Sequence, residues 1–178
     1  MREAYVDVQV EPMLAPLSGE SLQPRTANVS DDARSNIRVN GFWSRQQCAF
    51  FDIRVFYPQA QSYRNQPIAT LLKRNEAEKK RQYNDRIIQV ERGTFTPLVF
   101  STNGVMGQEA RIAMRKLATE IANKRKEPFS SVMGLLCCRI SFALIRAAIT
   151  CLRGTRRRMV PFEDNNVAVV LHEASVDF

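Results

Sequence analysis

The sequence contains a single histidine, His172, and four cysteines, at positions 48, 137, 138 and 151. No two of these cysteines have the spacing of a zinc-finger pair, and the histidine lies in the C-terminal tail. A zinc site built from cysteine and histidine is therefore not expected. Three of the cysteines fall within one apolar segment, where free buried thiols are the ordinary interpretation. This usage predicts a reducing, intracellular compartment, either the nucleus or the cytoplasm.

The first four residues lack the apolar stretch of a secretory signal. Long apolar runs are also scarce. The one candidate, residues 132–152, is interrupted by Arg139 and Arg146. Because charges at mid-bilayer depth are unfavourable, this run predicts a core helix and not a membrane span. On these grounds no membrane partner is expected.

Acidic residues are outnumbered by basic ones, 18 against 26, which gives 178 residues a formal net charge of +8. The tail, residues 159–178, holds four acids and no lysine or arginine, so residues 1–158 alone carry +12. This excess favours an anionic partner, with nucleic acid first and an anionic membrane surface second. The length suits one domain, expected over residues 1–158. The acidic tail has no predicted element and is either a solvated end or a competitor for the basic surface.

Alternating segments and long helical patterns outline the fold. Strands are predicted at 5–10, 36–43, 48–56 and 95–101, and Pro97 favours an edge position or a bulge in the last of them. Helices are predicted at 68–92, 107–126 and about 130–153. The predicted fold class is α/β, with a small mixed β-sheet flanked by helices and a pair of helices at the C-terminal end.

One lysine falls on the apolar side of the first long helix. At 100° per residue an apolar stripe forms from Ile68, Leu72, Tyr83, Ile87 and Val90. Lys79 lies in the middle of this stripe, with Glu76 beside it. A second charge, Asp52, interrupts the apolar strand at 48–56. Charges that face a core need partners, so an inward acid and an inward lysine indicate a site.

Simpler interpretations of both charges remain open. Asp52 can form a structural ion pair with Arg54 or Arg38, or lie on an exposed strand face. Lys79 can extend from the stripe to solvent along its aliphatic stem. Glu76 is interpreted as a partner of a nearby lysine on the same helix and not as a ligand.

Five segments together bring a known family into view. They read GFW at 41–43, AFFDIRV at 49–55, NEAEKKRQY at 75–83, GTFTPLVFS at 93–101 and CLRG at 151–154. Over about residues 6–158 the chain resembles the restriction-like endonuclease domain of site-specific non-LTR (LINE-type) retrotransposons. That domain is a branch of the PD-(D/E)XK nuclease superfamily. The resemblance implies a restriction-endonuclease-like core.

The resemblance also implies metal-assisted hydrolysis of a DNA phosphodiester. In the family two acids on neighbouring strands hold Mg²⁺, and a lysine polarises the attacking water and stabilises charge on the phosphate. The second acid maps to Asp52. Two residues later stands Arg54 and not lysine, so the following helix must supply the lysine. Lys79 is the candidate, and Lys80 is the fallback.

The chain departs from the family pattern at the first acid. Asn36 stands there and offers an oxygen without a charge. Loss of a ligand carboxylate should weaken a metal site by at least ~10–100-fold. Asp31 and Asp32 are close in sequence but out of register. Gln82 stands where the family tends to have lysine, and the family's upstream zinc knuckle and reverse transcriptase are missing. The chain therefore resembles a detached C-terminal nuclease fragment.

Arg139, Arg146 and Arg153 recur every seven residues, within about 40° of one line along the last predicted helix. One interpretation is a solvated stripe on an otherwise buried helix. The other is a row of nucleic-acid phosphate contacts, extended by Arg156, Arg157 and Arg158, which would make binding sensitive to salt.

These observations predict a retrotransposon-derived, Mg²⁺-dependent DNA endonuclease domain, impaired by Asn36 but still able to bind double-stranded DNA. Its ancestral role would be to nick the chromosomal target of the element. Reverse transcriptase or element RNA would be partners in the parent element. Two alternatives stay open: a non-catalytic basic nucleic-acid-binding module, and a structural or interaction protein.

Overall fold

A computed structural model describes residues 1–12, 14 and 35–153 of the chain, with side chains as far as Thr150. The chain divides into a compact unit, Met1–Ala148, and a second unit, Ile149–Phe178. All described strands and the first two long helices lie in the compact unit, together with most of the third. The predicted acidic tail lies outside the described residues.

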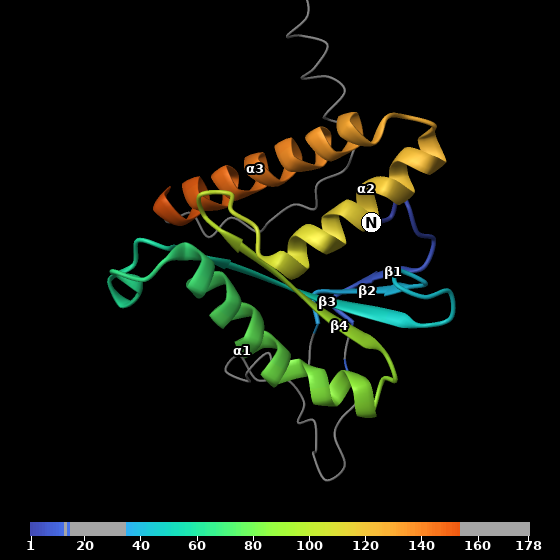
Figure 1. Ribbon diagram of the computed structural model, residues 1–178, viewed down its shortest axis with the longest axis horizontal. Coiled ribbons are helices and arrows are strands. Elements are labelled where there is room, and N and C mark those ends of the chain that lie inside the picture. Colours follow the sequence, from blue (N-terminus) through green and yellow to red (C-terminus); the bar gives the residue numbers. More distant parts are fainter. Residues whose placement is uncertain (13, 15–34, 154–178) are drawn as a thin grey trace, which may run out of the picture. The chain divides into compact units, whose positions relative to one another are not determined.

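Four strands form one mixed sheet in the order β1-β2-β3-β4 (Figure 1). They are β1 Val8–Val10, β2 Ile37–Asn40, β3 Cys48–Phe56 and β4 Thr94–Ser101. The pairs β1–β2 and β2–β3 are antiparallel, and β3–β4 is parallel. Parallel neighbours require a crossover, which here contains the helix α1, Ile68–Gln89. The predicted mixed sheet flanked by helices is therefore confirmed.

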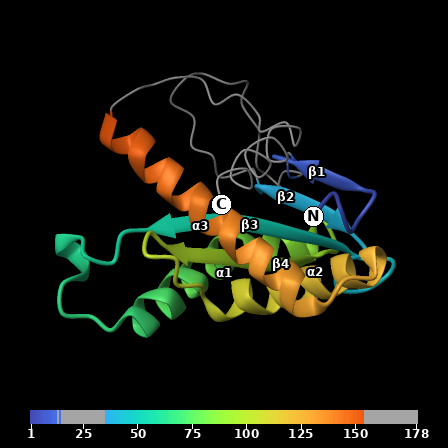
Figure 2. The ribbon, with the colours of Figure 1, turned by 90° about the horizontal axis from the view of Figure 1, so that it is seen from above.

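Helices cover both faces of this sheet (Figures 1 and 2). On one face α1 packs against β3 and β4, and Phe50 shares a cluster with Tyr83 and Ile87. On the other face α2, Gln108–Arg125, packs with Phe51 in a larger cluster. Because successive strand residues point to opposite faces, Phe50 and Phe51 contribute to different clusters. Any side chain of β3 can thus be assigned to a face by its position along the strand.

The last helix, α3, Phe129–Arg153, is not the core helix that its composition predicts. Its segment Phe129–Thr150 is long and apolar enough to cross a membrane by length and composition, yet only 6% of its most apolar window is buried. Val132 is buried against the α2 side of the sheet, whereas Phe142 is 72% exposed. The prediction fails because apolar composition does not supply a covering partner, and within the described residues only one side of α3, which includes Val132, packs against the core.

Most predicted boundaries hold within a few residues. β3 has the predicted bounds, and Pro97 lies in β4, an edge strand of the described sheet, where a missing N–H is tolerated. β2 ends earlier than predicted because the chain turns at Gly41, whose φ of 77° favours glycine. α1 ends at Gln89, three residues before its predicted end.

Candidate functional site

Asp52 lies near the middle of β3, which is hydrogen-bonded to β2 on one side and β4 on the other. It has the same parity along the strand as Phe50, so its side chain lies on the face that α1 covers. The residue is only 4% exposed. An acid that is this deeply buried among apolar side chains needs a positive partner.

Lys79 of α1 is that partner. Its Nζ lies 2.8 Å from Oδ2 of Asp52, and the two side chains are 17% and 6% exposed respectively. Oδ2 is buried and makes no aligned hydrogen bond with any described residue, so the contact is an ion pair outside the preferred hydrogen-bond directions. The ammonium also lies 5.3 Å from the ring centroid of Tyr83. The structure therefore brings together the acid and the lysine that the sequence singled out.

The arginines considered as structural partners of Asp52 are engaged elsewhere. Arg54 forms an ion pair of 2.9 Å with Glu78, on α1. Arg38 donates hydrogen bonds to Gln9 and to the sulfur of Cys48. Within the described residues, Lys79 is the only cation paired with Asp52.

Asn36 lies immediately before β2, in line with Asp52. The register pairs Ile37 with Phe51, so one step further along the two strands places residue 36 opposite residue 52. The Oδ1 atom of Asn36 accepts a hydrogen bond of 2.5 Å from the backbone N–H of Ile53. Asn36 is therefore a neighbour of Asp52 across the sheet, with its side-chain oxygen already occupied.

Within the described residues, Asp52 and Asn36 do not by themselves form the Mg²⁺ site that the resemblance implies. Mg²⁺ takes a near-octahedral shell of oxygen ligands, usually including carboxylates. Asp52 supplies one carboxylate, which faces Lys79, and the amide oxygen of Asn36 is used by Ile53. No group of three His, Cys, Asp or Glu side chains within the described residues is arranged to hold a metal ion. Asp31 and Asp32 lie outside those residues.

Lys80, the fallback lysine, is not brought to Asp52. It pairs with Glu109, in the first turn of α2, at 2.5 Å. Glu76 also contacts this turn, because its Oε1 accepts the backbone N–H of Glu109 at 3.0 Å. Burial, partly offset by that hydrogen bond, raises the pKa of Glu76. A Cβ at Gly107 would collide with the Glu76 carboxylate, so this close approach requires glycine. Glu76 is thus a helix cap and not a partner of Lys79.

The predicted arginine row lies only partly within the described side chains. Arg139 is bound to Glu3, and Arg146 is exposed on α3. The side chain of Arg153 and all of Arg156, Arg157 and Arg158 lie outside what the structure describes. The row therefore stays a prediction, and its first member is already paired with an acid.

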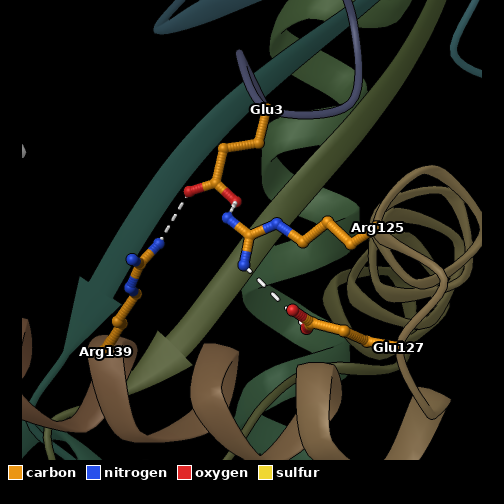
Figure 3. A network of polar contacts seen from close by, with 4 residues as sticks. All are labelled: Glu3, Arg125, Glu127 and Arg139. Atoms are coloured by element: carbon orange, nitrogen blue, oxygen red, sulfur yellow. Dashed lines mark hydrogen bonds and ion pairs between the residues drawn. The ribbon is translucent and has the colours of Figure 1, made fainter.

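Figure 3 shows the network around Glu3. Its two carboxylate oxygens contact Arg125, at 2.6 Å, and Arg139, at 2.9 Å, which come from α2 and α3. The hydrogen bond from Arg139, aided by the charge of Arg125, lowers the pKa of Glu3. Arg125 lies 4.0 Å from Glu127 as well. Ion pairs of Glu3 thus link the N-terminal segment to both α2 and α3.

Glu3→Gln is expected to lower the free energy of unfolding at neutral pH by about 0.5–1 kcal/mol, because partly exposed ion pairs contribute little. A carboxyl whose folded pKa is depressed stabilises the fold fully above its unfolded value, near 4.5. This contribution disappears as pH falls through the folded pKa. The difference between variant and native protein should therefore vanish in acid, as urea unfolding at several pH values would reveal. Glu127→Gln is the control, and an equal loss there would refute the assignment.

Comparison with known proteins gave no match to this chain among family models, curated sequences or solved structures.

Proposed function

We propose that this chain is a retrotransposon-derived DNA endonuclease domain that has lost most of its cleavage activity and retains binding to double-stranded DNA. The observation that carries the proposal is the buried ion pair between Asp52 and Lys79, with Asn36 next to it across the sheet. These are the three positions at which the resemblance implies catalytic chemistry. They come from the residue before β2, from β3 and from α1, which are separate along the chain.

The roles follow from the contacts. If both acids were present, Lys79 would place its ammonium where negative charge develops on the scissile phosphate. Asp52 holds that ammonium at 2.8 Å, and the ring of Tyr83 lies beside it. Asn36 replaces the carboxylate that a divalent cation would need, so the native site lacks one of its two acids. A weak or absent hydrolytic activity follows from that single loss of charge.

A second candidate is a basic nucleic-acid-binding module that never cleaves. The incomplete set of acidic ligands favours it as a description of this copy. The two candidates share DNA binding and differ in whether a restored acid brings back cleavage. Both imply an intracellular protein, with the nucleus giving access to chromosomal DNA. In a parent element, reverse transcriptase or element RNA would be the further partner.

The native protein is expected to bind double-stranded DNA with an affinity that falls steeply with salt, by a log–log slope of about 0.9 for each phosphate contacted. It should not nick supercoiled plasmid above background with Mg²⁺ or Mn²⁺. Filter binding over a salt series and gel analysis of plasmid would measure the two properties. Under the second candidate, Asp52→Ala should leave binding unchanged once circular dichroism has verified that the variant is folded.

Robust nicking by the native chain would show that Asn36 does not impair the site. If the protein has no DNA affinity near physiological salt, both nucleic-acid proposals fail. The remaining account would then be a structural or interaction protein.

A further inference from the structure

A groove of about 360 Å³ lies between α1 and α2, next to the segment that joins β4 to α2. Both helices contribute basic side chains to its walls. Lys73 comes from α1, and Arg111 and Arg115 come from α2. The last two are one helical turn apart, so their side chains lie on the same side of α2.

These three cations have no acidic partner among the described residues. Arg111 donates a long hydrogen bond, 3.5 Å, to the carbonyl oxygen of Met106. Neither Lys73 nor Arg115 forms an ion pair with an acid in the described part of the chain. Other cations do have acidic partners there, namely Arg54, Lys79, Lys80, Lys116, Arg125 and Arg139. Unneutralised positive charge thus converges on this groove.

Among the described residues that line the groove, the one acid already has a hydrogen-bond partner. Glu76 directs Oε1 to the backbone N–H of Glu109 at the start of α2. Burial disfavours its charged form and raises its pKa. The groove therefore keeps a positive character. Its remaining lining includes Leu72, Met106 and Ile112, an apolar surface suited to sugar rings more than to a bare ion.

We infer that this groove binds the sugar–phosphate backbone of double-stranded DNA. The inference rests on the proposed function and adds the surface that contacts the partner. Lys73, Arg111 and Arg115 would contact phosphates from two walls. Glu76 precedes Lys79 by one turn of α1, so the groove and the Asp52–Lys79 pair are adjacent along that helix.

The test compares two triple variants of the full chain that remove the same amount of charge. The groove variant combines Lys73→Gln, Arg111→Gln and Arg115→Gln. The control combines Arg81→Gln, Lys124→Gln and Lys126→Gln, which are exposed positions on α1, in the last turn of α2 and at the C-cap of α2. Circular dichroism and thermal melting verify that both fold.

For a 20-base-pair duplex, the groove variant should reduce the log–log salt slope by about 2–3, at 0.9 per lost phosphate contact. At about 0.15 M salt this corresponds to a loss of affinity on the order of 100-fold. The control should change the slope by less than about 1. Glu76→Gln, which keeps an acceptor for the Glu109 N–H, should strengthen binding.

Equal losses of DNA affinity in the two triple variants would refute the groove as the binding surface. They would not refute the proposed function, because restored nicking by Asn36→Asp tests that function separately. A mononucleotide that displaces the duplex at equal phosphate concentration would also refute the groove, because a backbone site needs several linked phosphates. If the native protein binds no DNA, the groove and retained DNA binding both fail.

Discussion

Lys79→Met is expected to lower the free energy of unfolding by about 3–5 kcal/mol, the largest single effect of any substitution considered. Methionine fills a similar volume but leaves the Asp52 carboxylate, whose side chain is 6% exposed, without a counter-charge. Within the described residues, no other cation reaches Oδ2. Urea unfolding of native and variant protein at pH 7 measures the difference.

Two further variants isolate the ion pair from the loss of a lysine. Lys80→Met removes the adjacent cation, whose side chain is 44% exposed, and should lower stability by no more than about 1 kcal/mol. The double variant Asp52→Asn, Lys79→Met should lose less than the sum of its single changes, because it leaves no unpaired charge. Additive losses would mean that the two side chains do not depend on each other.

Asn36→Asp is expected to raise Mg²⁺-dependent nicking of plasmid DNA by at least ~10–100-fold over the native protein. Aspartate has the shape of asparagine and can still accept the hydrogen bond from Ile53. It adds a second carboxylate next to Asp52 across the sheet. Two carboxylates on neighbouring strands are the Mg²⁺ ligands that the resemblance implies, and carboxylate oxygens suit a hard divalent cation.

Asn123→Asp is the matched control, since it makes the same chemical change at an exposed position of α2. It should leave nicking at background. Adding Asp52→Asn or Lys79→Met to Asn36→Asp should abolish the gain. A gain that survives Asp52→Asn would place the active acid elsewhere.

The pairing of Asp52 with Lys79 was predictable because both signals are local. A charge within an apolar strand and a charge within an apolar helical stripe each need only a periodicity of a few residues. The parallel β3–β4 pair then fixes α1 over the face of Asp52. The residue pattern and the sheet topology thus both place Asp52 and Lys79 at the interface between β3 and α1.

Partners separated along the chain were not predictable. Lys80 is a candidate catalytic lysine by sequence, yet the packing of α1 against α2 places it in an ion pair with Glu109. Arg139 was expected to contact phosphates or solvent, yet the N-terminal Glu3 binds it from 136 positions away. Nothing in the spacing of such residues specifies which surfaces will meet.

The groove between α1 and α2 could not be predicted from the sequence either. Arg111 and Arg115 are visible in the sequence as a pair four residues apart on a helix. Lys73 joins them only because two helices pack side by side. The net charge favours an anionic partner but does not locate its surface, and the seven-residue spacing of the arginines pointed to α3 instead.

Metal binding by the Asn36→Asp variant is the most direct measurement. Titration with Mn²⁺, followed by electron paramagnetic resonance of the free ion, should give an affinity at least ~10-fold higher than that of the native chain. The increase should be lost when Asp52→Asn is added. Identical Mn²⁺ affinities for the variant and the native chain would contradict the account, because residue 36 and Asp52 would then not share a site.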